Sequence, residues 1–252
     1  MAPTHSLPQY RQVADTLRRR IQNGVYRSGE VLPSLAELEQ IFSVSSITVR
    51  KALGILAEEG RVSGRRGFGT LVMPGRQEER VAIQVSGNFR EWLESASGQD
   101  RPMDQDVLGI AVKPGPPGVA KLLGAPEDGP LWCMRRVRRI KGTPVSYHVN
   151  YGLPAIFGAV TANMMAPCRS FVEVMRNDLG IPLGRMEQWV QPIVADRDLA
   201  ALLEIGFGDP LFFMENVYTS PEGEVIDVTH LYLRGDRYVY RASIPLEDSG
   251  RE

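Results

Sequence analysis

The N-terminal part of the chain contains runs of apolar residues at helical spacing. The first run begins near Pro8 and ends at Gly24. Its apolar positions are Tyr10, Val13, Leu17 and Ile21. A second run follows Ser34, which stands three residues before Glu37 as in a capping box. Its apolar positions are Leu35, Leu38, Ile41 and Phe42. The pattern predicts one helix between Pro8 and Gly24 and a second that begins at Ser34.

A third run follows almost at once, because only Ser43 and Val44 separate it from the second. Ser45 can cap this helix, and Gly60 can end it in a left-handed conformation. Its buried positions are expected to be Val49, Ala52, Leu53 and Leu56. Two short helices joined by so tight a turn are a helix-turn-helix, whose second helix can enter the DNA major groove. The candidate DNA contacts facing away from the apolar positions are Ser45, Ser46, Ile47, Thr48 and Arg50.

Arg50 is the strongest single candidate among these residues. A guanidinium group can bridge guanine O6 and N7 or bind a phosphate. The alternative is a structural salt bridge to Glu58 or Glu39. Operator binding would depend on Arg50 only in the first case.

The segment after Gly60 predicts a wing, which is a short hairpin beside a helix-turn-helix. Residues 61–73 form two short apolar runs around a glycine-rich tip that contains Gly64, Gly67 and Gly69. Glycine lets a backbone approach a ligand closely, and the neighbouring Arg65 and Arg66 suit the negative minor groove. The sequence therefore predicts a DNA-binding domain at 1–73.

Beyond a linker expected at 74–79, strand and helix patterns alternate irregularly through a second domain at 80–247. Strands are predicted at 80–86, 131–141, 144–150, 185–194, 211–219, 225–233 and 237–244. Helices are predicted at 89–95, 117–123, 170–179 and 196–205. Neighbouring strands separated by short turns indicate a largely antiparallel sheet, hence an α+β domain.

Two arginines lie in an otherwise apolar row of the strand at 131–141. Because side chains alternate across a strand, one face carries Trp132, Met134, Arg136, Arg138 and Ile140. If this face packs inward, the arginines need anionic partners, since unpaired buried charge is costly. A pocket for a small anionic ligand is one interpretation. The alternatives are that the opposite face is buried, or that internal carboxylates such as Glu187, Glu215 or Asp227 pair with the arginines.

Ser170 supports the pocket, because it stands three residues before Glu173 in another capping box. A helix that begins there would present free N–H groups to an anion.

Charge and composition separate the two domains further. Residues 1–75 hold ten Lys and Arg against six Asp and Glu, whereas the remainder holds nineteen against twenty-four. Only the first part is therefore expected to meet a polyanion. The sequence shows no membrane span and no signal peptide, which predicts a cytoplasmic protein. It also lacks metal-ligand spacing, a nucleotide-binding loop and a nucleophile–base pair, so neither a metal nor a cofactor is expected.

The N-terminal motifs resemble the winged helix-turn-helix domain of GntR-family bacterial transcription factors. The resemblance rests on Gly24-Val25-Tyr26, Leu32-Pro33-Ser34, Phe42-Ser43-Val44-Ser45, Thr48-Val49-Arg50-Lys51-Ala52-Leu53 and Gly67-Phe68-Gly69-Thr70. Leu35 and Ser46 stand where the family usually has Glu and Arg, so its operator sequence is not carried over. The resemblance implies DNA contacts at Ser34, Ser45, Thr48, Arg50 and Gly67 to Gly69.

The second domain resembles the UTRA ligand-binding domain of the HutC subfamily, which is similar in fold to chorismate lyase. The resemblance rests on Arg136 and Arg138 before Pro144, on Ser170, on Asp227 and on the run Arg234-Gly235-Asp236-Arg237-Tyr238. In relatives that sense sugar phosphates, the matching arginines and serine hold the phosphate, and carboxylates match His148 and Asp227. His148 replaces one carboxylate, which favours an anion other than an amino-sugar phosphate. Asn88 and Tyr238 are further pocket candidates by position.

These expectations together describe a homodimeric repressor whose operator affinity is controlled by a small anionic metabolite. Two alternatives remain at this level. One is a lyase-like enzyme acting on a small carboxylate, and the other is a DNA-binding protein without a ligand. Replacing Arg136 and Arg138 separates the last alternative from the first reading, because only a ligand-controlled protein would lose induction.

Overall fold

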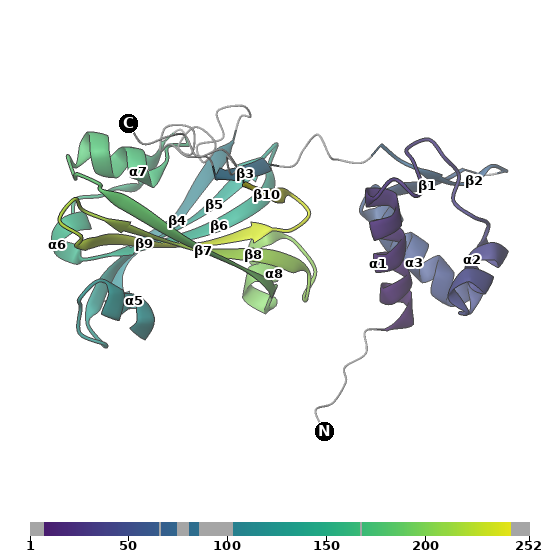
Figure 1. Ribbon diagram of the computed structural model, residues 1–252, viewed down its shortest axis with the longest axis horizontal. Helices are drawn as coiled ribbons and strands as arrows, with labels where there is room; N and C mark the ends of the chain where they lie inside the picture. Colours follow the sequence, from purple (N-terminus) through teal and green to yellow (C-terminus); the bar gives the residue numbers. More distant parts are fainter. Residues whose placement is uncertain (1–7, 66, 75–80, 86–102, 167, 243–252) are drawn as a thin grey trace, which may run out of the picture. The chain divides into compact units, whose positions relative to one another are not determined.

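The computed structural model describes residues 8–65, 67–74, 81–85, 103–166 and 168–242 (Figure 1). The chain divides into two compact units, Met1–Glu79 and Arg80–Glu252. Of the predicted linker at 74–79, only residue 74 lies within the described ranges, and the helix predicted at 89–95 lies outside them. No helix among the described residues is long and apolar enough to cross a membrane.

The first unit consists of a helical core with a short hairpin. Its helices are α1 (Gln9–Gln22), α2 (Leu35–Phe42) and α3 (Ser46–Glu58). Its strands are β1 (Val62–Arg65) and β2 (Gly69–Val72), which pair antiparallel from Val62 opposite Val72 to Arg65 opposite Gly69. The buried core contains the apolar positions expected from the helical spacing, among them Val13, Leu17, Leu38, Val49, Ala52 and Leu56.

Local side-chain bonds explain where the two helices of the helix-turn-helix begin and end. The Ser34 hydroxyl accepts a hydrogen bond from the Glu37 amide at 3.3 Å, and the Glu37 carboxylate accepts one from the Ser34 amide at 2.7 Å. Ser43 ends α2 in a left-handed conformation with φ 52°, and the Ser45 hydroxyl accepts from the Thr48 amide. These caps satisfy backbone groups that a helix end leaves unpaired, so the tight turn forms without burying orphan donors.

The capping box makes a testable contribution to stability. Ser34→Ala is expected to lower the free energy of unfolding of the first unit by about 1 kcal/mol, because the Glu37 amide loses its acceptor. Urea denaturation followed by helical circular dichroism measures the change. Ser63→Ala, on the exposed part of β1, is the matched control and should leave the midpoint unchanged. Equal midpoints for the two variants would contradict a stabilising cap.

The second unit is built on a six-stranded antiparallel sheet in the order β4-β5-β6-β9-β8-β7. Its strands are β4 (Asp104–Pro114), β5 (Pro130–Ile140), β6 (Thr143–Gly152), β7 (Arg185–Val194), β8 (Pro210–Thr219) and β9 (Val225–Arg234). The α+β class and the antiparallel sheet predicted from the sequence are confirmed.

Two features of the strands differ from the sequence prediction. Strand β4 was not predicted, because it is an edge strand whose polar start and bulge between Val107 and Gly109 break the alternation. The strands predicted at 80–86 and 237–244 lie outside the antiparallel sheet. They form β3 (Val81–Val85) and β10 (Tyr238–Ala242), which pair parallel with each other.

Short helices cover both faces of the sheet. They are α5 (Pro117–Leu122), α6 (Pro154–Phe157), η2 (Ala162–Met165), α7 (Phe171–Glu173), the π-helix η3 (Val174–Asp178) and α8 (Arg197–Leu203). Figure 1 shows α7 and the β3–β10 ribbon on one side of the sheet and α5 and α8 on the other. On the α7 side, Trp132 and Met134 pack with Phe171. On the opposite side, Val137 packs with Leu199 and Leu203. Strand β5 is therefore buried on both faces.

Candidate functional site

The exposed face of α3 carries the residues expected to contact DNA. Arg50 and Ser45 are exposed, while Ser46 and Thr48 are half-buried. Ile47 is 66% exposed, although it is a large apolar side chain. Within the described residues Arg50 forms no salt bridge with Glu58 or Glu39, so its guanidinium group is available to a ligand.

The hairpin between β1 and β2 carries the predicted DNA contacts Arg65, Gly67 and Gly69, whereas Ser34 lies at the start of α2. Gly67 and Gly69 both have positive φ, at 83° and 93°, which explains why glycine occupies these turn positions. Arg65 is exposed, and its guanidinium carbon lies 5.1 Å from the ring centre of the exposed Phe68. Arg66 lies outside the described residues.

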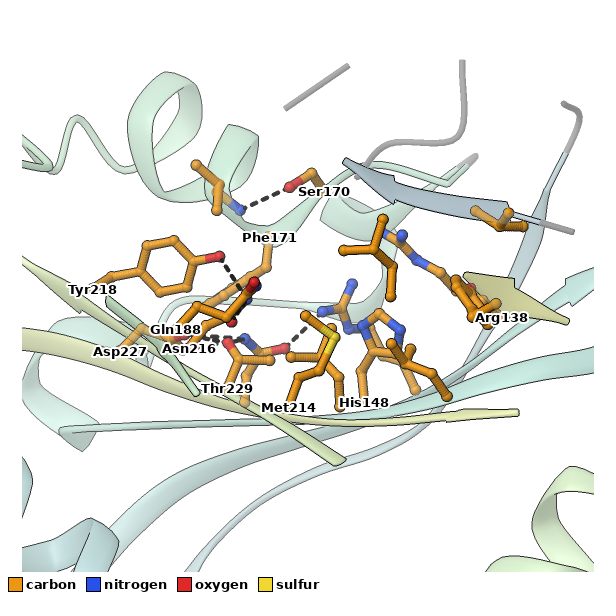
Figure 2. Close-up of a pocket in the computed structure, with 18 of the residues that line it drawn as sticks. Arg138, His148, Ser170, Phe171, Gln188, Met214, Asn216, Tyr218, Asp227 and Thr229 are labelled. Atoms are coloured by element: carbon orange, nitrogen blue, oxygen red, sulfur yellow. Dashed lines mark hydrogen bonds between the residues drawn. The ribbon is translucent and has the colours of Figure 1, made fainter. Parts of the chain in front are cut away.

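A cavity lies between the sheet, α7 and the β3–β10 ribbon (Figure 2). It leaves about 90 Å³ for the centres of water-sized molecules, several times the 10–15 Å³ or so that one water needs. Six of the seven residues predicted for the effector line it: Arg136, Arg138, His148, Ser170, Asp227 and Tyr238. The seventh, Asn88, lies outside the described residues. The cavity can therefore hold a small molecule among these side chains.

Arg136 is buried at the centre of this site, with 2% of its surface exposed. Its Nη2 donates to Asn150 Oδ1 at 2.7 Å, and its Nη1 donates to Gln105 Oε1 at 3.2 Å. Its Nε is buried and has no hydrogen-bond partner among the described residues. Arg138, two residues further along β5, is 6% exposed. Both side chains point inward, as one of the sequence interpretations required.

Among the described residues, no carboxylate forms a hydrogen bond or salt bridge with Arg136. Glu187 pairs with Arg185 at 2.8 Å, and Glu215 pairs with His230 at 2.8 Å. Glu187 and Glu215 therefore do not bond to Arg136. Asp227 is linked to Arg136 by hydrogen bonds through Asn150 and also interacts with its charge, as part of the carboxylate alternative required.

Burial and the neighbouring Arg138 charge lower the pKa of Arg136 to about 9. The group still carries its charge at neutral pH. Burial and the two arginines lower the pKa of His148 well below its usual value, so this imidazole is neutral. The buried Arg136 charge, whose hydrogen-bond partners among the described residues are neutral amides, makes this end of the cavity attractive to an anion.

Asp227 lies at the other end of the cavity, beside Tyr218, as Figure 2 shows. Its oxygens accept hydrogen bonds from the Thr229 hydroxyl and from Asn150 Nδ2, the latter at 3.2 and 3.3 Å. Burial raises the pKa of Asp227 to about 7, although these bonds and the Arg136 charge oppose the shift. The carboxyl is therefore half-protonated near neutral pH.

Ser170 lines the cavity from the start of α7. Its hydroxyl accepts from the Val172 amide at 3.2 Å, and its amide donates to the Glu173 carboxylate at 2.8 Å. The helix predicted at 170–179 is a single α-helical turn, which continues as the π-helix η3. The Ser170 side chain therefore stands at the start of a short helix that runs from Phe171 to Asp178 and lines the cavity there.

A hydrogen-bonded chain links His148 to the ribbon. The Tyr238 hydroxyl donates to Ser146 Oγ at 3.2 Å, and Ser146 Oγ lies 2.9 Å from His148 Nε2. Burial raises the pKa of Tyr238, which keeps its hydroxyl protonated as a donor. Tyr238 and His148 are thus held in place at the arginine end of the cavity.

A row of polar residues that the sequence did not predict crosses the middle of the cavity. In the register of the sheet, Asn150 stands opposite Thr229, Thr229 opposite Asn216, and Asn216 opposite Gln188. The alternation of Ser146, His148 and Asn150 along β6 is the one local signal that pointed to the row. Its continuation through three further strands depends on strand pairing.

Comparison with known families matches both units. The model described as "UTRA domain" matches residues 98–239, and the model described as "Bacterial regulatory proteins, gntR family" matches residues 9–72. The chain is 26% identical over 234 residues to the Mannosyl-D-glycerate transport/metabolism system repressor MngR of Escherichia coli, covering 92% of this chain and 94% of that protein.

Two further relatives agree with these matches. The HTH-type transcriptional repressor NagR of Bacillus subtilis is 25% identical over 236 residues, with 93% of both chains covered. The crystal structure of the possible transcriptional regulator YydK of Bacillus subtilis superposes with a TM-score of 0.56 at 21% identity. That superposition covers 95% of this chain and 100% of the other. At this identity the superposition shows the fold.

Proposed function

Because this chain belongs to the UTRA-domain regulators of the GntR family, we propose that it represses transcription by binding a DNA operator. It releases the operator when a small anion occupies the cavity. The chain is a transcriptional regulator and not an enzyme, since the relatives it matches over nearly their whole length are transcriptional regulators. Two of these relatives are named repressors, which supports repression here. The UTRA domain supports membership of the HutC subfamily.

The arrangement around Arg136 carries this proposal. A buried guanidinium group lines an internal space, and its hydrogen-bond partners among the described residues are the neutral amides of Asn150 and Gln105. An anion in that space would offset the buried charge. The neutral His148 beside it favours a phosphate or carboxylate over an amine-bearing ligand.

The mechanism requires two conformations with different affinities for the effector. We propose a homodimer whose two α3 helices bind the half-sites of a palindrome. In one conformation the spacing of these helices does not match the half-sites. An anion that binds this conformation more tightly then lowers operator affinity. An anion that bound both conformations equally would change nothing.

The first test concerns DNA recognition by α3. Arg50→Ala is expected to weaken operator binding by about 1–3 kcal/mol, because the exposed guanidinium group is proposed to contact a base or phosphate. Fluorescence anisotropy with a labelled operator measures the affinity. The control is Arg185→Ala, which removes the same charge from the second unit. Unchanged affinity for Arg50→Ala would remove this residue from the DNA-contact surface.

The second test identifies operator and effector with the full-length chain. Selection from random duplexes is expected to enrich a palindrome, and sedimentation should give twice the mass of one chain. Anionic metabolites are then screened for a rise in melting temperature, and each hit is added to the operator titration. A hit that releases the operator supports the proposal. No enriched duplex would refute DNA recognition, whereas an operator that no anion releases would favour a ligand-independent DNA-binding protein.

A further inference from the structure

Asn150 occupies a buried position between the two charged ends of the cavity. It lies on β6 and is 1% exposed. Its Oδ1 accepts from Arg136 Nη2 at 2.7 Å, while its Nδ2 donates to Asp227 and to Thr229 Oγ1, the latter at 2.6 Å. The acceptor side of the amide therefore faces the cation and the donor side faces the carboxylate. One side chain thus joins two groups that are 91 positions apart in the chain.

We propose that Asn150 is a positioning residue that joins Arg136 to Asp227, so that an anion bound at Arg136 is taken up together with a proton. The proton passes from solvent to the Asp227 carboxylate, which becomes a neutral carboxylic acid. The inference rests on the anion site proposed above. It adds that the regulator senses its anion and the pH together.

The electrostatic reason is that Arg136 is the cation that stabilises ionised Asp227. Among the described residues that line the cavity, the other charged side chain is Arg138 on β5, since His148 on β6 and Tyr218 on β8 are both neutral. A bound anion would neutralise part of the Arg136 charge and add negative charge to the same enclosed space. Both effects disfavour ionised Asp227, whose pKa already lies at about 7.

Asn150 makes this coupling depend on one side chain. Its amide holds Arg136 Nη2 at 2.7 Å, and both residues line the cavity. The same amide keeps its N–H bonds on Asp227. Removing the amide would free Arg136 to turn and would take one donor from Asp227, so anion affinity and proton uptake would both change.

Sulfate is the probe, because it carries no proton that titrates near neutral pH. Isothermal titration of the full-length protein with sulfate at pH 7, repeated in buffers of different ionisation enthalpy, gives the affinity and the number of protons taken up. The wild type should take up on the order of half a proton per sulfate, because Asp227 is half-protonated beforehand. Asn150→Ala should bind sulfate roughly tenfold more weakly, because Arg136 is no longer held in place by its charge-assisted bond to Asn150. It should take up almost no proton, because Asp227 without the Asn150 donor is already protonated.

Asp227→Asn provides the second variant, and it is nearly isosteric. It should bind sulfate with no proton uptake and with an affinity that does not vary between pH 6 and 8. Glu215→Gln is the matched control, because it makes the same change on the opposite face of the sheet, and it should behave as the wild type.

The outcomes separate this inference from the proposed function. Sulfate binding without proton uptake by the wild type, or uptake that persists in Asp227→Asn, would overturn the coupling and leave the anion site intact. Wild-type uptake that Asn150→Ala keeps in full would remove Asn150 from the coupling. If the wild type bound no sulfate at all, the anion site itself would be overturned.

Discussion

Replacing Arg136 and Arg138 together with glutamine is expected to abolish anion binding while leaving operator binding intact. Each charge-assisted hydrogen bond contributes about 1.5–3 kcal/mol, so losing two should lower anion affinity about 100-fold or more. Both residues lie in the second unit, whereas the operator contacts are proposed for the first. Sulfate calorimetry and an operator titration on the same preparation measure the two effects.

Arg135→Gln is the matched control for this double variant. Arg135 directly precedes Arg136 on β5, and its side chain is exposed on the opposite face of the sheet. It should therefore keep the anion affinity of the wild type. An equal loss in the control would mean that general charge, and not the cavity, attracts the anion. Undiminished binding by the double variant would place the anion elsewhere.

Asp227→Asn is expected to raise the free energy of unfolding relative to the wild type, and by more at neutral and alkaline pH than at acid pH. The pKa of Asp227 is about 7 in the folded protein, well above the value for an exposed aspartate. Wild-type stability tied to this group is therefore fully present below about pH 4 and is lost as pH rises through 7. Asparagine cannot ionise, so the difference between variant and wild type should grow in the variant's favour across this window.

The size of that change is at most about 4 kcal/mol, which corresponds to a shift of about three pKa units. Urea denaturation of both proteins at pH 4, 6 and 8 measures it as a difference, so that groups common to both proteins cancel. Any constant cost of the new amide beside Asn150 and Thr229 appears equally at every pH. A difference that stays the same from pH 4 to 8 would show that Asp227 does not titrate in this window.

The DNA-binding unit could be predicted almost completely from the sequence, because its determinants are local. Ser34 and Ser45 cap helices within three residues of themselves, and the apolar positions of α3 recur at the spacing of one helix turn. The inward row on β5 was also local, because alternation along a single strand places Arg136 beside Arg138.

The partners of the arginines inside the cavity depend on strand pairing. Asn150 bonds to Asp227 across 77 positions, and Gln105 reaches Arg136 from the unpredicted edge strand β4. The parallel pairing of β3 with β10 closes the cavity with two segments from opposite ends of the second unit. Helix caps and side-chain alternation are determined by a few consecutive residues, whereas a buried polar cavity depends on which strands become neighbours. That choice follows from the packing of the whole domain.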